Sequence, residues 1–87
     1  MVHVIKVKNI PADINEEQIT RILKIVKIDD IIQIIFKNQK SKDTTREIKK
    51  NAYVTCNQIN QILLCGSYIY KYNLNEYEIS YYKEKNV

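Results

Sequence analysis

Apolar residues recur at two different spacings in this chain of 87 residues, and the order of those spacings restricts the folds it can adopt. Apolar and polar residues alternate in residues 3–10, 51–56 and 77–82, as in strands that bury one face. Residues 15–26 instead repeat apolar residues at helical spacing, which predicts an amphipathic helix. The chain holds one Gly and one Pro, which leaves little for flexible linkers. We therefore expect one domain over residues 1–87.

Four strands are predicted, each with one core face. In the first, Ile5 and Val7 point inward and Lys6 and Lys8 outward. The second, "DIIQIIFK" over residues 30–37, is short and β-branched, so a strand is favoured over a helix. The inward residues of the other strands are Ile34 and Phe36, then Ala52, Val54 and Cys56, and finally Ile79 and Tyr81. Their outward residues are Gln33, Ile35, Lys37, Asn51, Tyr53, Thr55, Glu78, Ser80 and Tyr82.

Two helices are predicted between these strands. The first begins after Asn15, with Gln18 at capping-box spacing, and buries Ile19, Ile22, Leu23 and Val26. The second is capped by Asn57 and carries Ile59, Ile62 and Ile69. Gly66 leaves two alternatives for it. Either the helix tolerates this glycine, or it ends at Cys65 and "SYIYKY", residues 67–72, forms an extra strand.

The resulting order, β-α-β-β-α-β, predicts an α+β fold of the ferredoxin-like type. Both helices would pack on one face of a four-stranded antiparallel sheet, because each helix and each strand has one apolar side. The opposite face of the sheet would be left open to solvent.

Positive charge is concentrated in one part of the chain. The net charge is +4, and residues 37–50 hold six basic and two acidic residues, so this segment accounts for all of it. Such clustering is typical of a surface that binds phosphates, although charged runs are also common in solvated loops.

Catalytic and metal-binding patterns are not found. Cys56 and Cys65 lack the spacing of a metal or redox motif, and His3 is the only histidine. Paired carboxylates and glycine-rich phosphate loops are missing too, so we expect neither an enzyme nor a cofactor. No apolar run reaches the length of a membrane span.

Two segments resemble the signatures of the RNA-recognition motif family. "IKVKNI", residues 5–10, is similar to the first-strand signature, and "KKNAYVTC", residues 49–56, to the third-strand signature. Lys6 stands where the family usually has an aromatic residue, and Lys50 and Asn51 stand where it has Gly and an aromatic. Tyr53 retains the second aromatic. "NIPADINEEQ", "QIIF" and "ISYYK" further resemble small, stand-alone members of the family that act in splicing.

The resemblance implies binding of single-stranded RNA on the open sheet face, within a nuclear or, less favoured, cytoplasmic ribonucleoprotein. Bases would stack on Tyr53 and Tyr82. Hydrogen bonds to bases or sugars would come from Gln33, Asn51, Thr55 and Ser80, and phosphate contacts from Lys6, Lys8, Lys37, Lys40, Arg46, Lys49 and Lys50. The altered signatures favour an alternative, in which the domain serves mainly as a protein-interaction subunit of a larger ribonucleoprotein.

Overall fold

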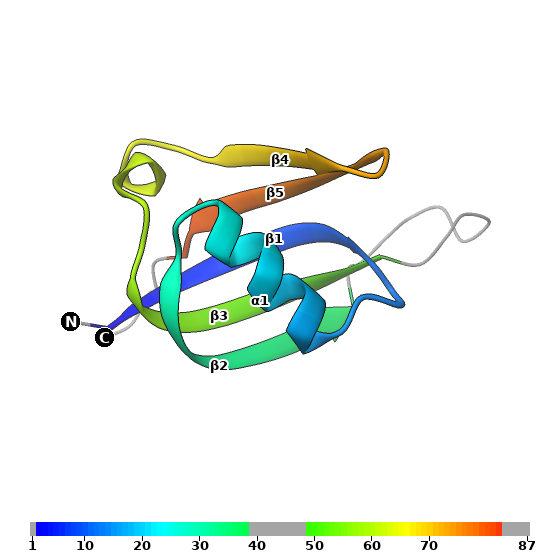
Figure 1. The fold of residues 1–87 in the computed structure, drawn as a ribbon, viewed down its shortest axis with the longest axis horizontal. Helices are drawn as coiled ribbons and strands as arrows, with labels where there is room; N and C mark the ends of the chain where they lie inside the picture. Colours follow the sequence, from blue (N-terminus) through cyan, green and yellow to red (C-terminus); the bar gives the residue numbers. More distant parts are fainter. Residues whose placement is uncertain (1, 39–48, 83–87) are drawn as a thin grey trace.

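One α-helix lies against a five-stranded antiparallel sheet (Figure 1). The computed structural model describes residues 2–38 and 49–82. The elements are β1 (His3–Pro11), α1 (Glu16–Ile25), β2 (Asp29–Asn38), β3 (Lys49–Gln58), the 3-10 helix η1 (Gln61–Leu64), β4 (Tyr68–Tyr72) and β5 (Asn75–Tyr81). The strands lie side by side in the order β2-β3-β1-β5-β4. No helix within the described ranges is long and apolar enough to cross a membrane.

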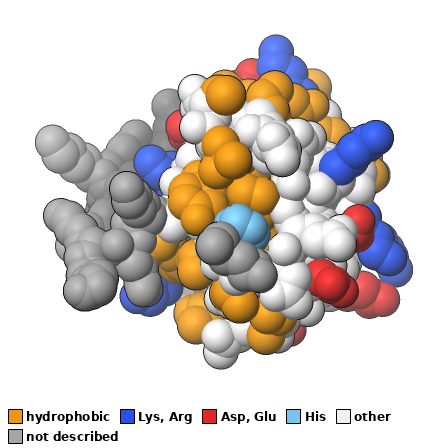
Figure 2. Space-filling model, turned by 90° about the vertical axis from the view of Figure 1, so that its left-hand side faces the viewer, with side chains coloured by type: hydrophobic (Ala, Val, Ile, Leu, Met, Phe, Trp, Pro, Cys, Tyr) orange, Lys and Arg blue, Asp and Glu red, His pale blue; other side chains and the backbone are white. Residues whose placement is uncertain are grey.

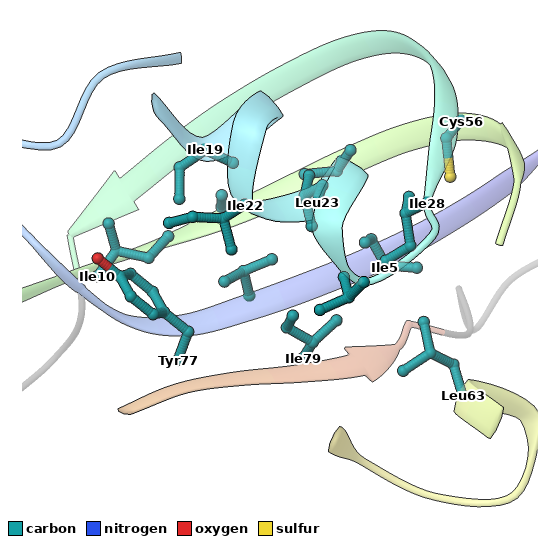
Figure 3. Close-up of a cluster of buried hydrophobic side chains, with 14 residues drawn as sticks. Ile5, Ile10, Ile19, Ile22, Leu23, Ile28, Cys56, Leu63, Tyr77 and Ile79 are labelled. Carbon is teal, nitrogen blue, oxygen red and sulfur yellow. The ribbon is translucent and has the colours of Figure 1, made fainter. Parts of the chain in front are cut away.

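The core lies between α1 and one face of the sheet, here called the helix-side face. Ile5 and Val7 of β1 are fully buried there, as are Val54 of β3 and Ile79 of β5. Figure 3 shows these strands converging on the apolar stripe of α1, from which Ile19, Ile22 and Leu23 point toward the sheet. The predicted inward residues of β1 and β3 are confirmed. The other face, here called the open face, carries no α-helix of the described residues.

Both ends of α1 are capped as its sequence favours. The Asn15 side chain accepts a hydrogen bond from the Gln18 backbone N–H at 2.9 Å, and the Gln18 side chain accepts one from the Asn15 backbone N–H at 3.0 Å, so the predicted capping box is confirmed. At the other end, Lys27 N–H donates to the Lys24 carbonyl and Ile28 N–H to the Leu23 carbonyl. Lys27 has a φ of 66°, so the helix ends in a Schellman motif without glycine.

The prediction of a two-helix, four-stranded βαββαβ sandwich is wrong. The region expected to form the second helix contains only the four-residue η1 and then the strand β4. β3 continues through Gln58, which pairs with Asp29, so Asn57 lies in a strand and cannot cap a helix. Ile69, expected on a helical stripe, is exposed on β4.

Local chemistry explains why the second helix stops after one turn. Asn60 caps η1 by accepting a hydrogen bond from Ile62 N–H, and its amide donates to the Val26 carbonyl at 3.1 Å, which ties η1 to the end of α1. Leu63 is the buried residue of this turn. Beyond Gly66, Tyr and Ile dominate the sequence, and these residues favour strands. The strand alternative for residues 67–72 is therefore the one that the structure adopts, as β4.

A two-residue turn joins β4 to β5, and its second residue is unusual. Tyr72 pairs with Asn75, and the intervening Asn73 and Leu74 have φ values of 53° and 64°. Two consecutive positive φ angles define a type I′ turn, which normally has Asn-Gly at these positions. Asn tolerates the left-handed conformation, whereas it costs a branched residue such as leucine about 1–2 kcal/mol.

Replacing Leu74 with glycine should therefore stabilise the fold. Leu74→Gly removes the steric cost and produces the favoured Asn-Gly turn, while the added freedom of the unfolded chain offsets part of the gain. We expect about 1 kcal/mol of stabilisation and a midpoint of thermal unfolding raised by about 4–8 °C, measured by circular dichroism. Leu64→Gly is the control, because Leu64 is also exposed but has no positive φ, and it should lower the midpoint. An unchanged or lower midpoint for Leu74→Gly would contradict the turn geometry.

The two thiols should differ in reactivity. Cys56 is fully buried on the helix-side face, and this burial raises the pKa of its thiol, whereas Cys65 is exposed after η1. The thiolate is the reactive form, so burial and a raised pKa both protect Cys56. A thiol reagent at neutral pH should rapidly modify only Cys65 in the native protein. In denaturant it should modify both cysteines. Equal rates in the native protein would show that β3 presents the opposite face to α1.

Candidate functional site

The register of the sheet brings the outward residues of neighbouring strands together on the open face. Tyr53 of β3 lies between Ile35 of β2 and Lys6 of β1, and Lys6 in turn is opposite Ser80 of β5. Residues directly opposite in an antiparallel pair share a face, so these four side chains form one row across the sheet. A neighbouring row contains Gln33, Thr55 and Val4.

Two tyrosine rings meet at the centre of this surface. Tyr82 follows the last residue of β5, and its backbone N–H donates to the Val4 carbonyl at 2.8 Å, which extends the pairing with β1 by one residue. The rings of Tyr53 and Tyr82 lie 5.2 Å apart at an interplanar angle of 77°. This edge-to-face geometry is favourable for aromatic pairs and orients the two ring planes differently. A single planar ligand therefore cannot stack on both rings at once.

Two lysines flank the ring of Tyr53. The Lys6 ammonium lies 5.4 Å from the ring centroid and that of Lys37 5.3 Å, both within the range of cation–π attraction. Lys8 occurs further along β1 on the same face, opposite Glu78 of β5. Lysines of β1 and β2 thus place positive charge beside the aromatic pair. Toward β5 this charge is reduced by Glu78.

The surface around the two rings is slightly hollowed. A depression of about 340 Å³ is lined by Val4, Gln33, Ile35, Lys37, Tyr53, Thr55 and Tyr82. Beside it, opposite Lys37, Asn51 has a buried side-chain oxygen with no hydrogen-bond partner. A buried acceptor without a donor costs free energy, so this oxygen is an unfavourable feature of the free protein.

The structure does not bring all of the predicted site residues together. Lys50 is on the helix-side face, where its ammonium lies 4.0 Å from the Phe36 ring centroid and donates to the Ala12 carbonyl. Lys49 donates a hydrogen bond to the Asn75 side chain at 2.7 Å. Its ammonium therefore connects β3 to the start of β5 instead of joining the lysines around Tyr53. Lys40 and Arg46 lie outside the described residues. Of the predicted site residues, those on the open face are Lys6, Lys8, Gln33, Lys37, Asn51, Tyr53, Thr55, Ser80 and Tyr82.

Sequence reasoning missed two apolar contributors to the open face. Val4 lines the depression, and Ile69 of β4 stands opposite Glu78 at the far side of the sheet. The alternation in "SYIYKY" is the signal that could have placed Ile69 on a strand. Ile35, predicted to point outward, does so with 44% of its side chain exposed.

A second exposed surface lies at the end of the molecule that contains η1. Figure 2 shows hydrophobic side chains in a band around the single histidine, His3, at this end. His3 makes an edge-on ring contact with Tyr81 at 5.8 Å, and Val2, Ile62 and Leu64 are exposed. These five residues are here called the apolar end.

Within residues 2–38 and 49–82, no three His, Cys, Asp or Glu side chains come together as metal ligands would. Comparison with protein-family models, curated proteins and solved structures finds no match to this chain.

Proposed function

We propose that this protein binds single-stranded RNA on its open face. The observation that supports this most is the Tyr53–Tyr82 pair, with Lys6 and Lys37 beside it on neighbouring strands. Single-stranded nucleic acids are typically held by aromatic rings that stack with bases and by basic side chains that contact the backbone.

The ring geometry favours two successive bases over one. Because the two ring planes differ by 77°, each ring can take its own base only if the strand turns between them. The depression beside Tyr53 offers Gln33 and Thr55 for hydrogen bonds to a base edge or a ribose hydroxyl.

Phosphate binding would come from the lysines that now lie over Tyr53. A base stacking on this ring would displace the ammonium groups from it, and flexible lysine chains can then reach the phosphates on either side. Lys8 extends the positive surface along β1. The resemblance of residues 5–10 and 49–56 to RNA-binding signatures is the support for a role in RNA processing in the nucleus, within a ribonucleoprotein.

A protein-interaction subunit is the second candidate function. The apolar end supports it, because a cluster of exposed hydrophobic side chains on a small domain often marks a protein contact. Ile35 on the open face is a further exposed apolar residue. A stable co-purifying protein, together with no measurable affinity for RNA, would favour this function over RNA binding.

Removing the Tyr53 ring should weaken RNA binding. Stacking contributes roughly 1–3 kcal/mol per base, so Tyr53→Ala should raise the dissociation constant about tenfold to a hundredfold. The measurement is fluorescence anisotropy with a labelled, mixed-sequence RNA of about ten nucleotides. Single-stranded DNA of the same sequence tests the preference for ribose.

Tyr72→Ala is the matched control for this substitution. Tyr72 is an exposed tyrosine of β4, opposite Asn75, and it lies on the helix-side face. Its loss should leave the affinity for RNA unchanged. The stacking role would be wrong if Tyr53→Ala bound RNA like the original protein, or if both variants lost affinity equally while their circular dichroism spectra stayed native.

The lysines should make binding dependent on salt in proportion to their number. Each phosphate contact to a single strand changes the slope of log K against log salt concentration by about 0.7. Lys37→Gln should therefore make the slope shallower by about that amount, and Lys24→Gln, on the exposed side of α1, should leave it unchanged. Equal slopes for the Lys37 variant and the original protein would remove this residue from the interface.

A further inference from the structure

The ring of Tyr53 is already in contact with two cations in the free protein. The Lys6 ammonium lies over this ring at 5.4 Å from its centroid, and the Lys37 ammonium lies over it at 5.3 Å. The ring of Tyr82 packs against it edge to face, and Tyr53 is half-buried. A base that stacks on Tyr53 must therefore take a place that an ammonium group now occupies.

The sheet brings the two lysines, here called the lysine pair, to the ring from both sides. Lys6 of β1 is directly opposite Tyr53 of β3, and Lys37 of β2 is opposite Asn51, two residues away on the same face. Among the described residues, neither ammonium group forms an ion pair with a carboxylate. The Tyr53 ring is thus the partner that holds both cations, and each lysine can exchange it for an anion.

We infer that the lysine pair competes with a base for the Tyr53 ring, and that the site therefore selects a base flanked by two phosphates. This inference rests on the proposed function, because it concerns the same ring. A nucleoside can stack on the ring but gives the displaced ammonium groups no partner. A nucleotide within a strand has one phosphate on its 5′ side and one on its 3′ side, so each lysine exchanges the ring for a phosphate.

The strength of the two contacts sets the size of the effect. A cation–π contact of an exposed lysine changes an equilibrium constant about twofold to fivefold, so both together should weaken stacking of an uncharged nucleoside about fivefold to thirtyfold. Phosphates repay this loss by charge attraction, which salt screens. The preference for a base with two phosphates should therefore be greatest at low salt.

A positive surface without competition would also prefer phosphates, so that preference alone does not identify the role of the lysine pair. The distinguishing quantity is the affinity for a ligand that has no phosphate. If Lys6 and Lys37 only contact phosphates, their removal leaves the affinity for a nucleoside unchanged. If they compete for the ring, their removal raises this affinity.

Chemical-shift titrations at low salt with adenosine, adenosine 5′-monophosphate and adenosine 3′,5′-bisphosphate test the inference. The affinity of the original protein should increase in that order. In the double variant Lys6→Gln/Lys37→Gln, the affinity for adenosine should rise about fivefold to thirtyfold, and the preference for the bisphosphate should largely disappear.

Lys71→Gln is the matched control. Lys71 of β4 is on the open face, where it is opposite Glu76, and it is separated from β3 by β1 and β5. This variant loses the same charge from the same face but keeps both contacts to the Tyr53 ring. Its affinity for adenosine should equal that of the original protein.

A measurement without ligand tests the contact itself. The ring current of Tyr53 should shift the ε-methylene protons of Lys6 and Lys37 upfield of those of Lys71, and Tyr53→Leu should remove this difference. Equal ε-proton shifts for all three lysines in the original protein would overturn the inference. So would an affinity for adenosine that the double variant leaves unchanged or lowers, or that Lys71→Gln raises equally.

The failure of this inference can be distinguished from that of the proposed function. If labelled RNA binds the original protein and the double variant gains no affinity for adenosine, RNA binding on the open face stands and the competition is wrong. If neither RNA nor any of the three adenosine ligands shifts the resonances of Tyr53 and Tyr82, the proposed function is wrong and this inference falls with it.

Discussion

The burial of one face of β1 is the constraint on which the rest of this structure depends. β1 is the central strand, paired with β3 on one side and β5 on the other, and its Ile5 and Val7 are completely buried under α1. Side chains alternate along a strand, so this burial places Lys6 on the opposite face. The pairing then fixes Tyr53 and Ser80 beside it. A shift of one residue in either pairing would expose the core and bury the lysine, which makes the register strongly specified.

The same alternation explains how much could be predicted from the sequence. Apolar and polar residues alternate over residues 5–8 of β1 and 51–56 of β3, so the inward residues and the outward position of Tyr53 followed directly from the pattern. The capping of α1 was equally readable, because Asn15 and Gln18 act through local hydrogen bonds. The residue pattern within one strand does not show which side chains of neighbouring strands come into contact. The approach of Tyr82 to Tyr53 depends on the pairing of β5 with β1, and the cation–π contact of Lys37 depends on that of β2 with β3.

The second half of the chain was harder to predict because its apolar residues fit two periods. Ile59, Ile62 and Leu63 have helical spacing, and Ile62 and Leu63 do lie in one helical turn, η1, which Asn60 caps. Tyr68, Tyr70 and Tyr72 alternate, and this spacing continues into a turn that pairs β4 with β5. The decision between helix and strand rested on the tertiary partner, since a strand at this position completes its hydrogen bonds only with β5. The basic residues Lys49 and Lys50 show a related limit. Both were predicted to contact phosphates because they belong to the basic segment. The fold instead sets the hydrogen bond of Lys49 to Asn75 and the position of Lys50 over Phe36.

Because a hairpin forms in place of the predicted second helix, different residues are exposed on each face of the sheet. The β4–β5 hairpin widens the sheet and leaves Tyr70, Tyr72 and Ile25 partly in water on the helix-side face. The added strand also extends the open face, where Ile69 and Glu78 now lie beyond Ser80. The fold thus carries two partly apolar surfaces on opposite sides, one with lysines around an aromatic pair and one with the exposed Ile25 and Tyr72. Because these surfaces lie on opposite faces of the sheet, a ligand on the open face would leave the exposed residues of the helix-side face uncovered.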